Sequence, residues 1–123
     1  MYYCFDEKEQ KAIVVAVVDN SLSQGGYFSD GGNNTEDQVF LLSYMEATKY
    51  FPTDESRACS LTPYALSVEN DDYAGWWNRS PYMWNSKAYL LETGDVGVRG
   101  FMRATYKSGI RPAVWVTTDA LGL

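Results

Sequence analysis

Two tryptophan- and arginine-bearing stretches decide the fold of this chain: Gly75-Trp76-Trp77-Asn78-Arg79-Ser80-Pro81 and Gly109-Ile110-Arg111-Pro112-Ala113-Val114-Trp115. Each stretch places an arginine within an apolar strand, where an unpaired charge is costly to bury. The arginine must therefore be paired, hydrogen-bonded or stacked on an indole ring. We expect Arg79 and Arg111 to be structural clamps that pin neighbouring strands and orient loops, with binding of an anionic ligand as the alternative.

The rest of the sequence divides into a helical half followed by strands. Short strands punctuated by glycine are predicted at 76–79, 88–91, 96–98 and 110–116. Helices first and a strand meander second indicate an α+β fold rather than a doubly wound one. The length of 123 residues suits a single domain, 1–123, with one core.

The helical half begins with Asp6 and Glu9, which have the spacing of a capping box. A helix is predicted from there to Asp19-Asn20, because apolar residues recur at helical spacing. The β-branched run Ile13-Val14-Val15 favours a strand instead, and this alternative stays open.

The middle of the chain mixes a loop, a strand and short helices. Turn residues predict a long surface loop over 20–36, followed by a buried strand at 39–42. Ser43 and Glu46 form a second capping box, for a helix that runs through Tyr50 and stops before Pro52. Further short helices are predicted at 53–59 and, with a proline at the first helical position, at 63–67.

The composition limits the partners and the catalytic sites that this chain can have. The net charge is −6 and the basic residues are scattered, so the basic patch of a nucleic-acid binder is missing. The longest apolar run, Ala12 to Val18, is too short to span a bilayer. Without histidine, Ser-His and Cys-His nucleophile pairs are excluded. We therefore predict a binding protein without nucleic-acid partner, membrane insertion, metal or other cofactor.

The two cysteines, Cys4 and Cys59, lack the spacing of a zinc site, and we expect both to be small buried hydrophobes. Asparagine and aspartate side chains on the loops offer oxygen ligands for calcium, but the spacing of an EF-hand is absent.

The two stretches together resemble an uncharacterised bacterial and phage domain family with the pattern W-W-L-R-S-P-G followed by G-V-R-P-A-L-W. Residues 5–9 resemble its first helix, segments within 39–51 its central strand and helix, and segments within 57–65 the part that follows. That family is similar in pattern to the formylglycine-generating-enzyme-like branch of the C-type lectin fold. The branch includes variable proteins diversified by retroelements, which bind changing partners through altered side chains on a fixed scaffold. The resemblance implies a C-type-lectin-like fold and a binding function.

The chain departs from this family at two places. Family members usually carry further strands before the first helix, so this chain is expected to be N-terminally short, either as a fragment or with a missing strand. A missing strand would expose a sheet edge, through which a homo-oligomer is expected to form. The family's glycine after Ser-Pro is Tyr82 here, and the large side chains that follow predict an exposed aromatic patch.

These features favour a non-catalytic ligand- or protein-binding module. We expect its scaffold to be held by Trp76, Trp77, Arg79, Arg111 and Trp115. The predicted contact surface is Tyr82, Met83, Trp84, Asn85, Lys87, Met102, Arg103, Thr105 and Tyr106. We call these nine residues the display residues; they form one group at 82–87 and a second group at 102–106. The second group lies in an irregular stretch, 99–107, which is typical of a display loop. Ordinary loop and sheet surface is the alternative for both groups. The partner, protein or carbohydrate, and the compartment stay open.

Two other functions compete with this hypothesis. A structural or assembly module of a phage particle or a cell-surface protein would bury the aromatic patch in a self-interface. An oxidase of the formylglycine-generating type is less favoured, because those enzymes carry a cysteine pair in the C-terminal half. Here both cysteines precede the first stretch.

Overall fold

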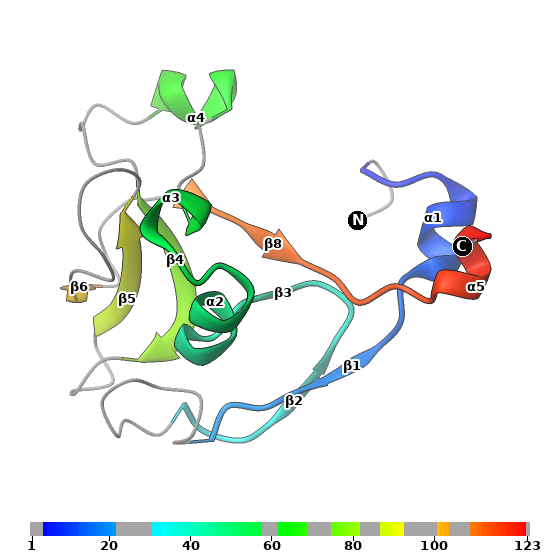
Figure 1. Ribbon diagram of the computed structural model, residues 1–123, viewed down its shortest axis with the longest axis horizontal. Helices are drawn as coiled ribbons and strands as arrows, with labels where there is room; N and C mark the ends of the chain where they lie inside the picture. The colour runs from blue at the N-terminus through cyan, green and yellow to red at the C-terminus, as the bar shows by residue number, and fades with distance from the viewer. Residues whose placement is uncertain are drawn as a thin grey trace.

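The computed structural model describes residues 4–21, 31–57, 62–68, 75–81, 87–92, 101–103 and 109–122, and the fold mixes helices with strands (Figure 1). The helices are α1 Glu7–Ala12, α2 Tyr44–Tyr50, α3 Asp54–Arg57, α4 Pro63–Val68 and α5 Thr118–Leu121. The strands are β1 Ala16–Val18, β2 Thr35–Asp37, β3 Phe40–Leu41, β4 Gly75–Pro81, β5 Lys87–Glu92, β6 Phe101–Arg103, β7 Gly109–Ile110 and β8 Pro112–Ala113. This mixture agrees with the predicted α+β class.

The first helix begins as predicted and ends earlier. Both hydrogen bonds of the Asp6–Glu9 capping box are present, and α1 stops at Ala12. The prediction of a helix as far as Asp19 is wrong, because the β-branched residues that follow are extended. Ile13 forms a bridge with Val116, and β1 pairs with β2. The local sequence is compatible with both a helix and a strand here, and pairing with distant segments decides in favour of the strand.

The middle helices follow their local signals. Ser43 caps α2, Glu46 completes the capping box, and the helix ends at Phe51, next to Pro52. Short helices are present where 53–59 and 63–67 were predicted to be helical, as α3 and α4. These starts and stops depend on neighbours three or four residues away, so the sequence reports them directly.

The largest sheet has the strand order β6-β5-β4-β7. β4 and β5 pair antiparallel, as the predicted meander requires. β6 pairs antiparallel with β5 although no strand was predicted at 101–103, and β7 lies parallel to β4. The prediction of one strand over 110–116 is wrong: β7 and β8 are separated at Arg111, and β8 pairs with β3 instead. Helices do not all precede strands either, since β1, β2 and β3 come before α2. The predicted strand at 96–98 lies outside the described residues.

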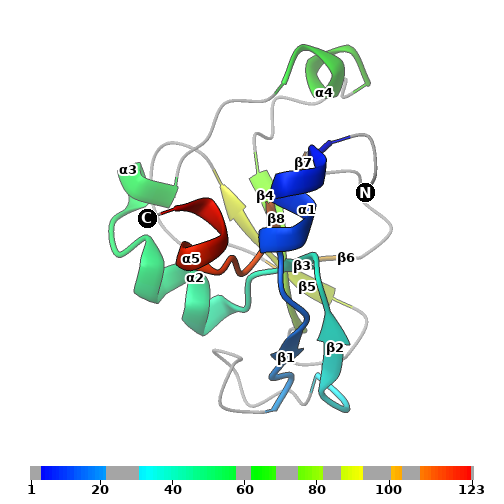
Figure 2. The same cartoon turned by 90° about the vertical axis from the view of Figure 1, so that its right-hand side faces the viewer.

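The two ends of the described chain meet. α1 and α5 pack against each other at one end of the molecule (Figure 1). β1 and β2 form a ribbon that extends away from this end. In Figure 2 this ribbon lies at the bottom of the view, whereas α4 lies at the top. The predicted loop over 20–36 is shorter at its end, because β2 already begins at Thr35.

A small core lies between α2 and the large sheet. Leu42, Ala47 and Trp76 are buried, and their partly buried neighbours are Phe40, Phe51 and Ala113. Only 1% of Trp76 is exposed. The expectation of a buried Cys4 is wrong, because its thiol is exposed and free, and Cys59 lies outside the described residues. No described helix is both long and apolar enough to cross a membrane.

Candidate functional site

The strand β4 carries the first of the two motif stretches and contains a bulge. The register with β5 shifts between Trp77 and Pro81, so that three residues of β4 face a single residue of β5. Such a bulge bends the strand and redirects its side chains. Asn78 and Ser80 are buried, and the Arg79 side chain between them is only 12% exposed. The bulge therefore removes three consecutive polar residues from solvent.

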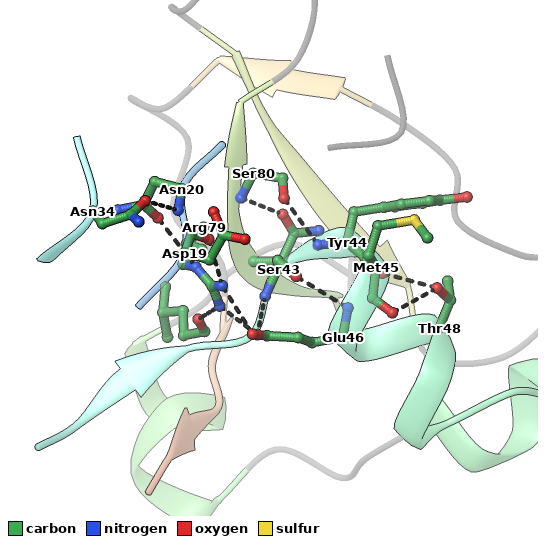
Figure 3. Close-up of polar contacts among 12 residues, drawn as sticks. Asp19, Asn20, Asn34, Ser43, Tyr44, Met45, Glu46, Thr48, Arg79 and Ser80 are labelled. Carbon is green, nitrogen blue, oxygen red and sulfur yellow. Dashed lines mark hydrogen bonds and ion pairs between the residues drawn. The ribbon is translucent and has the colours of Figure 1, made fainter. Parts of the chain in front are cut away.

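The guanidinium group of Arg79 lies at the centre of a polar network (Figure 3). Its Nη2 donates to Glu46 Oε1 at 2.9 Å and to the Asp19 carbonyl at 2.9 Å. Its Nη1 donates to the Leu41 carbonyl at 2.8 Å and to Glu46 Oε2. Its Nε donates to Asn20 Oδ1 at 3.2 Å. These five acceptors match the five N–H donors of a guanidinium group, so no donor of Arg79 is left over.

The contacts of Arg79 are those that the clamp interpretation requires. They join β4 to β3, to α2 and to the segment that follows β1, which are separated from Arg79 by 33 to 60 residues in sequence. The pair with Glu46 is bidentate, the geometry in which arginine binds carboxylates most strongly. Arg79 is therefore a fully satisfied structural cation rather than a vacant anion site.

Glu46 serves two partners at once. Its Oε2 accepts a hydrogen bond from the Ser43 backbone N–H at 2.9 Å, as the capping box requires, and both carboxylate oxygens face Arg79. Burial by itself would raise the pKa of the Glu46 carboxyl. The hydrogen bonds from Arg79 and from the Ser43 backbone, together with the charge of Arg79, outweigh burial and hold that pKa below its ordinary value. Glu46 is thus stabilised as the anion that neutralises Arg79.

Asn20 extends the network into the segment between β1 and β2. Its backbone N–H donates to Asn34 Oδ1 at 2.9 Å, and its side-chain Nδ2 donates to the Asn33 carbonyl at 3.0 Å. Its own carbonyl accepts from Gly31 N–H at 3.0 Å. Figure 3 shows Asn20 between Asn34 and Arg79. Arg79 therefore orients Asn20, whose hydrogen bonds join the two ends of the connection between β1 and β2.

Two buried residues of the bulge complete the junction with α2. Ser80 Oγ accepts a hydrogen bond from the Tyr44 backbone N–H at 2.9 Å, and Asn78 Oδ1 accepts from Ser80 N–H at 2.9 Å. The Asn78 Nδ2 group has no hydrogen-bond partner within the described part of the chain.

Arg111, in the second motif stretch, has a different environment. Its guanidinium carbon lies 4.2 Å from the ring centroid of Phe51 and 5.2 Å from that of Trp76. Its Nη1 donates to the Arg57 carbonyl at a long 3.4 Å, and the same carbonyl accepts from Trp76 Nε1 at 3.0 Å. Among the described residues no carboxylate forms an ion pair with Arg111. The predicted stacking on an indole ring is present, and no described carboxylate pairs with Arg111.

The tryptophans of the two motifs differ in exposure. Trp76 is buried and Trp77 is half-buried, whereas Trp115 is 49% exposed. The Trp115 indole meets the Tyr50 ring edge-on, with centroids 6.3 Å apart, and Tyr50 is itself 44% exposed. Trp115 contacts the scaffold through its backbone, because its carbonyl accepts from Val14 N–H at 3.0 Å. Its indole is therefore part of the surface.

The predicted display residues fall partly on the large sheet. Lys87 opens β5, and the pairing of β5 with β6 sets it opposite Arg103, while Met102 is opposite Ala88. The expectation of an irregular stretch over 99–107 is wrong at its centre, because Phe101–Arg103 is a strand. The other six display residues lie outside the described residues: Tyr82, Met83, Trp84, Asn85, Thr105 and Tyr106.

Sequence reasoning missed several members of the Arg79 network. Glu46 was recognised only as a helix cap, and Asn20 only as a helix end. Nothing in their local sequence signals a contact with an arginine far along the chain. One signal could have pointed to Glu46: an arginine within an apolar strand needs a partner, and Glu46 is an acidic residue close after the predicted buried strand at 39–42.

The described residues form no group of three or more potential metal ligands among histidine, cysteine, aspartate and glutamate. One domain family, described as a domain of unknown function (DUF6273), matches residues 1–118. No curated protein and no solved structure matches the chain. The expectation of an uncharacterised family is confirmed, and the likeness to C-type lectins stays a prediction.

Proposed function

The chain belongs to the DUF6273 family, and on that premise we propose that it is a ligand- or protein-binding module with a C-type-lectin-like scaffold rather than an enzyme. The absence of histidine from the whole sequence supports binding over catalysis. On this proposal the contact surface consists of the nine predicted display residues, Tyr82 to Asn85, Lys87, Met102, Arg103, Thr105 and Tyr106.

One observation carries this proposal. The β5–β6 ladder sets Lys87 directly opposite Arg103, although the two residues come from separate display groups. β6 ends the strand order of the large sheet within the described residues, so Lys87 of one group and Met102 and Arg103 of the other lie on adjacent strands at one edge. Like charges at directly opposed positions lower the stability of a strand pair. Two basic residues in this position are better explained by a ligand than by folding.

The Arg79 network, on β4, supports the same proposal. A binding protein that tolerates changes in its contact residues needs a scaffold that those changes do not disturb. Arg79 satisfies its donors with acceptors from β3, α2 and the end of β1, none of which is a display position. The scaffold and the display edge therefore use separate interactions, as in the retroelement-diversified proteins that the family resembles.

Matched serine substitutions test this separation. We expect a Lys87→Ser, Arg103→Ser double variant to stay folded, with a free energy of unfolding within about 1 kcal/mol of the parent, because on this proposal the two side chains serve a ligand and not the fold. Arg79→Ser should cost about 3 kcal/mol or more, because it leaves Glu46 as an uncompensated charge. Urea unfolding of both variants measures the difference. Equal losses in the two variants would refute a separate display edge.

Sister genes provide an independent test of diversification. Substitutions should concentrate at 82–87 and 102–106, while Trp76, Arg79, Arg111 and Trp115 stay unchanged. Substitutions spread evenly over both groups would contradict a display function.

An assembly module is the second candidate, and one observation favours it. Val15, directly before β1, is 60% exposed, and Val17, within β1, is 69% exposed. Within the described residues β1 pairs with β2 alone. A strand edge beside exposed valines is a surface on which another chain can add a strand. Sedimentation velocity tests this candidate: a chain that stays monomeric at micromolar concentrations would exclude an assembly module, whereas an oligomer is compatible with both candidates.

A further inference from the structure

The two motif arginines differ in how their donors are used. Arg79 donates to five acceptor atoms, two of which are the carboxylate oxygens of Glu46. Arg111, which is half-buried, forms one hydrogen bond with the described part of the chain, 3.4 Å long, to a neutral carbonyl. The aromatic rings of Phe51 and Trp76 attract its charge but accept none of its N–H groups in the plane of the guanidinium. Arg111 is thus partly withdrawn from water without a counter-charge among the described residues, which is a costly state.

The surroundings of Arg111 repeat this pattern of cations beside aromatic rings. Phe51 follows Tyr50 at the end of α2, so the exposed Tyr50–Trp115 pair lies at the same end of the helix as Arg111. Lys49 adds a second cation, with its Nζ 5.5 Å from the centroid of the Tyr50 ring. In a chain of net charge −6, this end of α2 combines two cations with two exposed aromatic rings.

We infer that Arg111 anchors a site for the carboxylate group of a ligand, whose apolar part contacts the exposed rings of Tyr50 and Trp115. A guanidinium group with unused in-plane donors fits a planar carboxylate in bidentate geometry. A phosphate group carries more negative charge, which the net charge of −6 repels more strongly. This site uses none of the display residues, so the inference goes beyond the proposed function and names the chemical class of the ligand at a second site.

Benzoate is a suitable probe, because it joins a carboxylate to an aromatic ring, and benzamide is its neutral counterpart of the same shape. The unsubstituted chain is titrated with each at constant ionic strength, following the Nε–Hε signal of Arg111 and the indole N–H signal of Trp115 by NMR. Benzoate should shift both signals saturably and bind about tenfold or more tightly than benzamide, since a charge-assisted hydrogen bond is lost with the amide. Inorganic phosphate should bind more weakly than benzoate.

Two variants identify the residue responsible. Arg111→Gln should lower benzoate affinity about tenfold or more at Trp115, while Lys8→Gln, which removes an equal charge from the exposed face of α1, should leave it unchanged. Equal shifts with benzoate and benzamide, tighter binding of phosphate, or no saturable shift at Arg111 in the parent chain would each overturn the inference. The titration uses no protein partner and no display residue, so its failure is distinguishable from failure of the display proposal.

Discussion

A Glu46→Gln substitution keeps the shape of the side chain and removes the charge that faces Arg79. Glutamine still offers Oε1 to the Ser43 backbone, because capping boxes accept glutamine as well as glutamate. The other end of the amide is an N–H₂ group, which cannot accept from the guanidinium. The bidentate ion pair is therefore lost while α2 keeps its cap.

The size of the loss follows from the exposure of the pair. Breaking a fully buried ion pair costs about 3–5 kcal/mol, and an exposed pair contributes about 1 kcal/mol or less. The Arg79 and Glu46 side chains are 12% and 26% exposed, which places the pair between these limits. We expect Glu46→Gln to lower the free energy of unfolding by about 2 kcal/mol.

The N-terminal helix supplies a matched control. Glu9 occupies the same capping-box position in α1, at 2.9 Å from the Asp6 backbone N–H, and is exposed with no contact to an arginine among the described residues. Glu9→Gln should cost less than about 1 kcal/mol, the effect of one charge in the first turn of a helix. The difference between the two variants in urea unfolding isolates the contribution of Arg79.

The pH dependence gives a second readout. The pKa of Glu46 is lower in the folded chain than its ordinary value of 4.5, so the folded state binds the proton less readily than the unfolded state. The stability from this pair is present above the ordinary value and is lost as the pH falls through the lower, folded value. The penalty of Glu46→Gln should therefore shrink between pH about 7 and pH about 3. A penalty that equals that of Glu9→Gln, or one that is constant over this range, would refute the reasoning.

Three further predictions concern the core, the loop base and the β1 edge. Trp76→Phe should lower the free energy of unfolding, measured by urea titration, by about 2–4 kcal/mol. It leaves a cavity and removes the hydrogen bond from the indole N–H to the Arg57 carbonyl. A loss below about 1 kcal/mol would contradict this packing. Gly31→Ala should cost about 1–3 kcal/mol, since a Cβ there would lie 2.6 Å from the Asn20 carbonyl oxygen, and faster amide exchange at Asn20 should accompany it. Val17→Lys should leave stability within about 0.5 kcal/mol, because the side chain is 69% exposed, and any self-association seen by sedimentation velocity should weaken; persistence of a dimer would exclude the β1 edge as its interface.

The elements predicted best are those with a local cause. Ser43 and Glu46 define the start of α2 because the capping bonds join residues three apart, and Pro63 marks the start of α4 for a similar reason. Strands β4 and β5 were predicted where glycine and polar residues separate apolar runs, whereas β6, Phe101–Arg103, was not predicted. Its three residues carry too short a pattern to be distinguished from a loop.

The candidate site was predicted only in part. The sequence identified Arg79 and Arg111 as charged residues that need partners, but treated them alike. The structure separates them, because Glu46 lies beside Arg79 and aromatic rings lie beside Arg111. Trp115 likewise shares a motif with Arg111 but lies half exposed.

The sequence by itself determined the α+β class, the helix caps and the two arginines on which the site depends, because these follow from spacing and from the cost of burying a charge. The tertiary structure alone decided that Ile13 to Val18 is extended, that β4 bulges, and that Glu46 and Asn20 meet Arg79. The physical reason is distance along the chain: a capping bond is complete within one helical turn, whereas an acceptor for Arg79 is chosen by how strands and helices pack. That packing minimises unpaired charge and exposed apolar surface over the whole chain at once.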